Sequence, residues 1–207
     1  MTQANECENI AELFKGFSAC AVANISDNLD RAIGARGIRP FHNGGTMAGR
    51  ALTVKAAPGD NTFIYQALEI VSPGDVIVVD GAGYEDRALI GEIMANIAES
   101  RGAAGFVLDG SIRDVDAISS KSFPVFARNV IHLGPYKGGV GKLNVPVSIG
   151  GMSVNPGDIV VGDSDGVTAF GPDIASDLLK ATRRQQAKET DILASIANGT
   201  YTGAYSK

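Results

Sequence analysis

The stretch that decides the fold of this chain runs from Asp80 to Asp116 and reads DGAGYEDRALIGEIMANIAESRGAAGFVLDGSIRDVD. Twenty residues within it separate an acidic residue, Glu92, from the adjacent pair Arg113 and Asp114. This spacing is typical of one helix followed by one short strand, so the chain folds back and brings both ends together. Two carboxylates beside a guanidinium suit a hard metal ion and an anionic, oxygen-rich substrate. We therefore expect these three residues to share one site.

Length and composition predict a single globular domain over residues 1–207. Apolar residues make up 44% of the chain and charged residues 20%, which is an ordinary balance for a globular protein. The net charge is −5 and the sequence has no block of Lys and Arg. Because binding to phosphates needs clustered positive charge, we expect no nucleic-acid partner.

The N-terminal sequence MTQANECENIAELF is acidic and lacks the pattern of a signal peptide. The chain has no run of about 18 apolar residues that would span a membrane. We therefore expect a cytoplasmic protein with no membrane partner. Cys7 and Cys20 are the only cysteines, and their spacing predicts free thiols rather than disulfides or a zinc site.

Periodicity and turn residues predict alternating strands and helices between two helical ends. The N-terminal helices span about 5–33, with Ser26-Asp27 capping the second, and the C-terminal helix spans about 173–197. A helix over 88–100 is expected to present one apolar face, made of Leu89, Ile93, Met94 and Ile97. Strands are expected at 47–56, 76–80, 104–108, 125–129, 145–149, 152–154 and 159–162, and further helices at 61–69 and 115–119.

One internal repeat joins residues 72–81, SPGDVIVVDG, with residues 155–163, NPGDIVVGD. In each, proline sets the first turn angle and glycine adopts a positive φ, so the turn leads sharply into a strand. The acidic residues after the strands, Asp80 and Asp163, either face a site or belong to turns that fix the sheet geometry. For Asp163 and Asp165, a role in metal binding and an ordinary turn into a strand both stay open.

Several runs resemble the RraA-like family: GEIM at 91–94, RG at 101–102 and VLDGSIRDVD at 107–116. The likeness continues in NVPVSIGG at 144–151, PGD at 156–158 and DSDGV at 163–167. It covers nearly the whole chain, and its specific part is the acidic residue followed, after twenty residues, by Arg-Asp. The family includes aldolases for 4-hydroxy-4-methyl-2-oxoglutarate (HMG) and 4-carboxy-4-hydroxy-2-oxoadipate (CHA), and a non-enzymatic regulator of ribonuclease E.

The resemblance implies an α/β fold, an αββα sandwich of the swivelling β/β/α type, assembled as a homotrimer or as a hexamer. It also implies a divalent cation, Mg²⁺ or Mn²⁺, bound directly by Asp114. Glu92 would reach this cation through water. So would Glu189, from the C-terminal helix of a neighbouring subunit.

The implied substrate is a 2-oxo acid, and the implied catalytic residues are Arg113 and Glu92. Arg113 would contact the keto oxygen and carboxylate, and backbone amides of Gly91, Glu92, Ile93 and Met94 would hold the carboxylate at a helix N-terminus. Glu92 would steer the water that carries protons. The implied reaction cleaves HMG, or a related 4-hydroxy-2-oxo acid, to pyruvate and a 2-oxo acid, with oxaloacetate decarboxylation as a side activity.

Alternative interpretations accompany each of these assignments. Ribonuclease regulators of the family typically lack the Asp after the Arg, so the presence of Asp114 favours the enzyme over the regulator. Arg113-Asp114 is also compatible with an ion pair that caps a helix, and Glu92 with a solvated acid in a first helical turn. The run GPYKGG at 134–139 has no Walker pattern and is interpreted as a surface loop. Lys137 within it is not expected to form a Schiff base.

Overall fold

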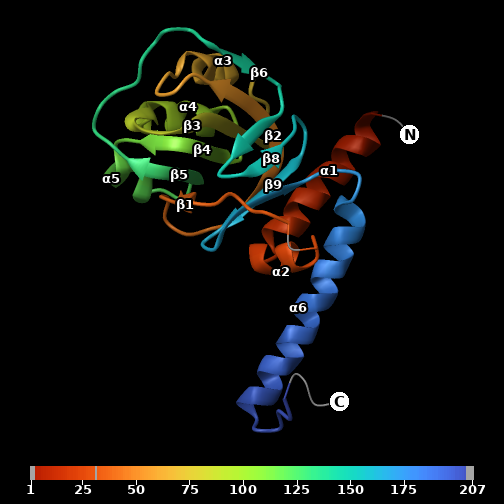
Figure 1. Ribbon diagram of the computed structural model, residues 1–207. Helices are drawn as coiled ribbons and strands as arrows, with labels where there is room; N and C mark the ends of the chain where they lie inside the picture. The colour runs from red at the N-terminus through yellow and green to blue at the C-terminus, as the bar shows by residue number, and fades with distance from the viewer. Residues whose placement is uncertain (1–2, 31, 204–207) are drawn as a thin grey trace.

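A run of β-branched residues, VIVV at 76–79, forms the middle of the main sheet, and all four side chains are fully buried. Such a run is typical of a strand that is covered on both faces. The computed structural model describes residues 3–30 and 32–203, with side chains from residue 10 onward, and places eight strands in this sheet (Figure 1). The strands are β1 (Arg39–Pro40), β2 (Met47–Ala56), β3 (Asp75–Ile90), β4 (Gly105–Ile112), β5 (Val125–Val130), β6 (Gly141–Leu143), β9 (Ile159–Asp163) and β10 (Gly166–Phe170).

The strand order is β1-β5-β4-β3-β2-β9-β10, and β6 pairs with β2 beside this path. Strands β2, β3, β4 and β5 run parallel to one another, whereas β9, β10, β1 and β6 pair antiparallel with their neighbours. A separate hairpin joins β7 (Val147–Ile149) and β8 (Met152–Val154). The helices are α1 (Gln3–Ser18), α2 (Val22–Asp27), α3 (Thr62–Ile70), α4 (Glu92–Ser100), α5 (Val115–Ser119) and α6 (Ala175–Ala197).

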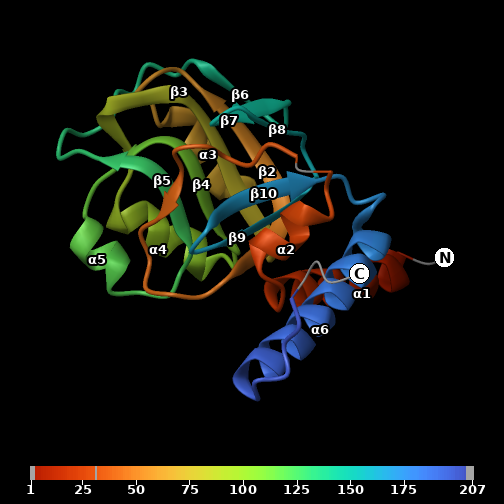
Figure 2. The same cartoon turned by 60° about the horizontal axis from the view of Figure 1, so that its bottom comes forward.

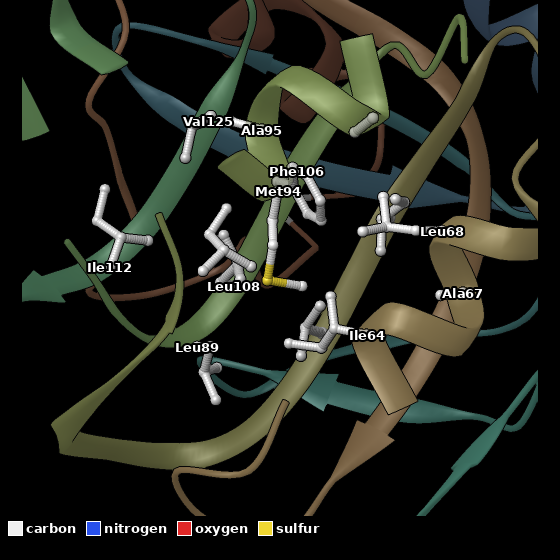
Figure 3. Close-up of a cluster of buried hydrophobic side chains, with 14 of the residues drawn as sticks. Ile64, Ala67, Leu68, Leu89, Met94, Ala95, Phe106, Leu108, Ile112 and Val125 are labelled. Carbon is white, nitrogen blue, oxygen red and sulfur yellow. The ribbon is translucent and has the colours of Figure 1, made fainter. Parts of the chain in front are cut away.

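Three apolar clusters divide the domain into layers. Between the sheet and helices α3, α4 and α5, side chains such as Ile64, Met94 and Phe106 point toward one another (Figure 3). The opposite side of the sheet packs on the β7–β8 hairpin through Ile149 and Val154. Helices α1, α2 and α6 pack together against β9 and β10 (Figures 1 and 2). These layers confirm the predicted α/β class.

The helix predicted at 88–100 is wrong over its first residues, because β3 continues through them. Ala88 and Ile90 pair with β4, and helix α4 begins only at Glu92. Leu89 is therefore a buried strand residue, whereas Ile93 is 70% exposed. The predicted apolar face is confirmed for Met94 and Ile97, which pack in the core, and is wrong for Leu89 and Ile93, because the helical period does not continue back across the end of β3.

The predicted start of the second N-terminal helix is also wrong. Ser26 and Asp27 are the last residues of α2, which begins at Val22. The N–H of Val22 donates to Asp163 Oδ2 at 2.8 Å. The acceptor lies on β9, so no local capping pattern could have revealed this helix start.

The repeated Pro-Gly-Asp segments are turns that fix the sheet, in agreement with the structural interpretation. Gly74 and Gly157 adopt φ of +84° and +87°. The acidic residues after the strands accept backbone N–H groups: Asp80 from Ala82 at 3.0 Å, and Asp163 from Asp165 at 2.9 Å. Both carboxylate oxygens of Asp163 therefore have structural roles, one at the start of α2 and one in the turn after β9.

The structure also bears on the predicted free thiols and on the search for membrane-spanning segments. Cys20 is buried and unpaired, and the Cys7 side chain lies outside the described residues. Within residues 3–30 and 32–203, every helix is too short or too polar to cross a membrane.

A mostly buried ion pair between Asp109 and Arg128 connects the β7–β8 hairpin to the main sheet. Asp109 ends the regular part of β4 and accepts Arg128 Nε at 2.6 Å. Its other oxygen accepts the N–H of Gly150, in the β7–β8 turn, at 2.8 Å. One carboxylate therefore links two parallel strands with the hairpin that covers them.

We predict that Asp109→Ala lowers the free energy of unfolding by about 2–4 kcal/mol, because Arg128 is left largely buried without its partner. Urea unfolding followed by circular dichroism measures this loss. Asp177→Ala, which removes a fully exposed partner of Lys180, is the matched control and should unfold like the wild type. Equal midpoints for all three proteins would contradict the structural role of the buried pair.

Candidate functional site

The site lies where two neighbouring parallel strands end. Ile90 at the end of β3 pairs with Ile112 at the end of β4, so the turns that follow lie side by side. Gly91 then leads into α4, and Arg113 and Asp114 lead into α5. The N–H of Arg113 donates to the Ile90 carbonyl at 3.0 Å and fixes one turn against the other.

Asp114 makes its contacts across this pair of turns. Its Oδ2 accepts the N–H of Glu92 at 3.0 Å and lies 3.8 Å from Arg113 Nε. The backbone of Asp114 adopts φ +57°, ψ +39°, a left-handed conformation that few non-glycine residues adopt outside special sites. Because both contacts use Oδ2, the other oxygen is left for a different partner.

The charged pair is not a closed salt bridge. The side chains of Arg113 and Asp114 are each 44% exposed, and 3.8 Å is long for an ion pair. A guanidinium held this loosely still has donors for a substrate anion. The first-turn N–H groups of Ile93 and Met94 add to this, because they have no partner four residues earlier in the helix.

A cavity of about 100 Å³ opens at this point. Five of the residues named from the sequence help to line it: Gly91, Ile93, Met94, Arg113 and Asp114. The Glu92 side chain is exposed and lines a neighbouring hollow between α4 and α5, with Ala117 and Lys121. Glu92 thus meets Asp114 through its backbone N–H, and its carboxylate lies outside the cavity wall.

Sequence reasoning missed three polar residues of the cavity wall: Asn61, Tyr65 and Lys137. Asn61 is 3% exposed, its Nδ2 lies 3.4 Å from Met94 Sδ, and its buried Oδ1 has no hydrogen-bond partner. Lys137 Nζ lies 5.5 Å from the centre of the Tyr65 ring. The interpretation of 134–139 as a plain surface loop is therefore incomplete, because Lys137 belongs to the cavity. The sequence feature that could have indicated this role of Lys137 is the pair of glycines that follows it, Gly138 and Gly139.

Glu189 lies on α6, a helix that stands apart from α3 and α4 (Figures 1 and 2), and no residue of α6 lines the cavity. It accepts Asn24 Nδ2 at 2.6 Å and Gln185 Nε2 at 3.0 Å. The hydrogen bonds from Asn24 and then Gln185 hold the pKa of Glu189 below its ordinary value. The single chain does not bring Glu189 to Asp114, and a contribution from a neighbouring subunit stays a prediction.

The residues present fit a hydrated divalent cation rather than a fully protein-ligated one. The described part of the chain contains no cluster of three His, Cys, Asp or Glu side chains that would enclose a metal. Mg²⁺ needs less than that, since it is often held by one or two carboxylates and keeps several waters. A Cβ at residue 91 would collide with Asp114 Oδ2, so the carboxylate occupies space that only glycine leaves.

Comparison with known proteins identifies the family. Residues 22–169 match the family described as RraA-like, Aldolase/RraA, and the chain belongs to this family. A Halalkalibacterium halodurans protein named "Putative 4-hydroxy-4-methyl-2-oxoglutarate aldolase" is 40% identical over 166 residues, which cover 80% of this chain and 79% of that protein. The crystal structure of an uncharacterized Pseudomonas syringae protein superposes with a TM-score of 0.80 at 28% identity, covering 91% of this chain and 94% of the other.

A second solved structure has a different description. The RNA-processing inhibitor RraA from Thermus thermophilis superposes with a TM-score of 0.67 at 28% identity, covering 72% of this chain and 92% of the inhibitor. The fold is therefore the RraA-like fold. Because relatives with this fold are named both as aldolases and as inhibitors, the site residues must carry the functional argument.

We predict that Gly91→Ala folds but weakens binding of Mn²⁺ by about 10-fold or more, because the new methyl group would displace Asp114, the carboxylate expected to bind the cation. The φ of −144° at Gly91 suits alanine, so backbone strain is not expected. Paramagnetic titration with Mn²⁺ measures the affinity, and thermal unfolding verifies the fold. Unchanged affinity in a folded Gly91→Ala protein would show that Asp114 is not the ligand.

Proposed function

We propose that this protein is a divalent-metal-dependent aldolase, a carbon–carbon lyase. It would cleave 4-hydroxy-4-methyl-2-oxoglutarate or a related 4-hydroxy-2-oxo acid to pyruvate and a second 2-oxo acid. The observation that supports this most is the meeting of Asp114, Arg113 and the α4 N-terminus at one cavity. A carboxylate for a cation, a guanidinium and free N–H groups together match the chemistry of a 2-oxo acid.

In this proposal Asp114 holds Mg²⁺ or Mn²⁺ directly, and the cation supplies Lewis-acid stabilisation of negative charge. Arg113 binds the 2-oxo acid end of the substrate. Its guanidinium stabilises the charge that builds on the keto oxygen as the carbon–carbon bond breaks. The same charge builds when CO₂ leaves oxaloacetate, so we also propose oxaloacetate decarboxylation.

The protein's other groups orient the substrate and move protons. N–H groups of Ile93 and Met94 bind the substrate carboxylate at the positive end of α4. Lys137 adds a second positive charge to the wall of the cavity. Glu92 is proposed to act through a water, as proton carrier between the C4 hydroxyl and the pyruvate carbon, since its carboxylate lies outside the cavity.

The second candidate is a non-enzymatic regulator of ribonuclease E, favoured by the similarity to the Thermus inhibitor. A regulator acts through a protein surface and has no use for a carboxylate placed beside a guanidinium in a cavity. The retained Asp114 therefore supports the enzyme.

We predict that the purified protein releases pyruvate from 4-hydroxy-4-methyl-2-oxoglutarate and from oxaloacetate, loses this activity in EDTA, and regains it with Mg²⁺ or Mn²⁺. Asp114→Ala should lower kcat by about 100-fold or more, because it removes the proposed ligand of the cation that stabilises the transition-state charge. A lactate dehydrogenase-coupled assay measures pyruvate. If no 2-oxo acid is consumed with any divalent metal, the aldolase proposal fails and inhibition of ribonuclease E should be assayed instead.

We further propose that the protein assembles as a homotrimer or a hexamer, with Glu189 of one subunit near the cavity of the next. The far half of α6 projects from the body of the domain (Figures 1 and 2). Leu193 and Ile196 on this half are 65% and 52% exposed. Large apolar side chains on a projecting helix support a contact with another copy.

Subunit complementation tests the shared site. Glu189→Gln and Asp114→Ala should each be nearly inactive, whereas a mixture refolded together should regain part of the activity, because some hybrid cavities combine intact Asp114 with intact Glu189. Light scattering gives the oligomeric state. Full activity of Glu189→Gln, or a fully active monomer, would remove Glu189 from the site.

A further inference from the structure

The chain contains three Pro-Gly-Asp turns, and one of them differs from the other two. In all three the aspartate N–H donates to the carbonyl three residues earlier, and the glycine has a positive φ. The donor–acceptor distances are 2.9 Å for Asp60 to Ala57, 3.0 Å for Asp75 to Ser72 and 3.2 Å for Asp158 to Asn155. The backbones of the three turns are therefore equivalent.

The carboxylates are used differently. Asp75 Oδ2 accepts the N–H of Ser72 at 2.9 Å, and Asp158 Oδ2 accepts that of Asn155 at 2.7 Å, so each closes its own turn. Asp60 instead turns away from Ala57, whose N–H donates to the Val140 carbonyl at 3.1 Å. Something other than turn formation therefore determines where the Asp60 carboxylate points.

Asp60 connects the start of α3 with a distant loop. Its Oδ1 accepts the N–H of Thr62 at 2.8 Å. Its Oδ2 accepts the N–H of Gly138 and, at 3.3 Å, that of Gly139. Asp60 is 3% exposed, and bonds from backbone N–H groups to a carboxylate are stronger than neutral ones.

These bonds keep the carboxylate ionised. Burial by itself raises the pKa of Asp60, but hydrogen bonds from Thr62, Gly138 and Gly139 outweigh it and leave the pKa below the ordinary value. The negative charge is therefore present at neutral pH, where the bonds to the loop matter.

The loop is held on the other side of Lys137 as well. The N–H of Tyr136 donates to the Gly59 carbonyl at 2.8 Å, and the Arg87 guanidinium lies 4.0 Å from the centre of the Tyr136 ring. Lys137 thus stands between two anchored neighbours, and its side chain lines the cavity. Because the backbone is anchored on both sides of Lys137, only the rotamers of its side chain remain free to vary.

We propose that Asp60 is a positioning residue, whose carboxylate fixes the loop around Lys137 and so holds the lysine ammonium group at the anionic substrate. The part of this inference that concerns the substrate rests on the proposed function. The part that concerns the loop rests only on the hydrogen bonds described above. Asp75 and Asp158 show that a Pro-Gly-Asp turn does not require this arrangement, and both are natural controls.

Amide hydrogen exchange tests the loop without any substrate. Asp60→Asn should speed exchange at Gly138 and Gly139 by about 10-fold or more, because a local opening no longer breaks a charge-assisted bond. Asp158→Asn, which weakens an equivalent turn, should leave exchange at these two glycines unchanged. Unchanged exchange in Asp60→Asn overturns the proposal whether or not the protein is an aldolase. Should Asp60→Asn fail to fold, Asp60→Ser retains an acceptor for Thr62 and is too short to reach Gly138.

A double-mutant cycle tests whether Asp60 acts through Lys137. Asp60→Asn should lower kcat/KM for pyruvate release by about 10-fold in the wild-type background, and by less than about 2-fold in the Lys137→Met background. A merely structural role would give the same loss in both backgrounds, and that result overturns the proposal. If the wild type consumes no 2-oxo acid, the proposed function fails, and the exchange comparison alone still decides whether Asp60 holds the loop.

Discussion

The parallel pairing of β3 with β4 is the constraint on which the rest of the structure depends. Because parallel neighbours end at the same edge, Gly91 and Arg113 follow their strands side by side. β3 has 16 residues and β4 has 8, so the pairing includes register shifts between Asp80 and Ile90. Leu89 fits beside Gly81 and Gly110, where any Cβ would collide with its methyl group.

The buried carboxylates of this acidic chain accept backbone N–H groups, and two of them, Asp75 and Asp109, also pair with an arginine. Asp80, Asp109 and Asp163 accept N–H groups of the hairpin and of a helix start, and Asp75 and Asp158 close turns. At the buried aspartates Asp75, Asp109 and Asp158, such a bond gives a backbone donor a partner within the protein. The net charge of −5 therefore reflects partly how the layers are joined, not only how the surface meets solvent.

The cavity is locally positive within this acidic protein. Arg113, Lys137 and the N-terminus of α4 surround it, and Asp114 is the one acidic side chain on its wall among the described residues. A cation on Asp114 would make the cavity still more positive. Such a field favours a dianionic substrate over a neutral one and raises its encounter rate.

The sequence by itself determined the α/β class, most strand positions and the pairing of the Arg-Asp motif with the glycine-led helix. These features follow from residues close together in the chain: β-branched runs, Pro-Gly turns and the twenty-residue spacing. Only the tertiary structure decided that β3 extends to Ile90, that Asp163 caps α2, and that Asn61 and Lys137 reach the cavity. Each of these depends on hydrogen bonds or packing between segments far apart in sequence, and such contacts leave no local periodicity to read.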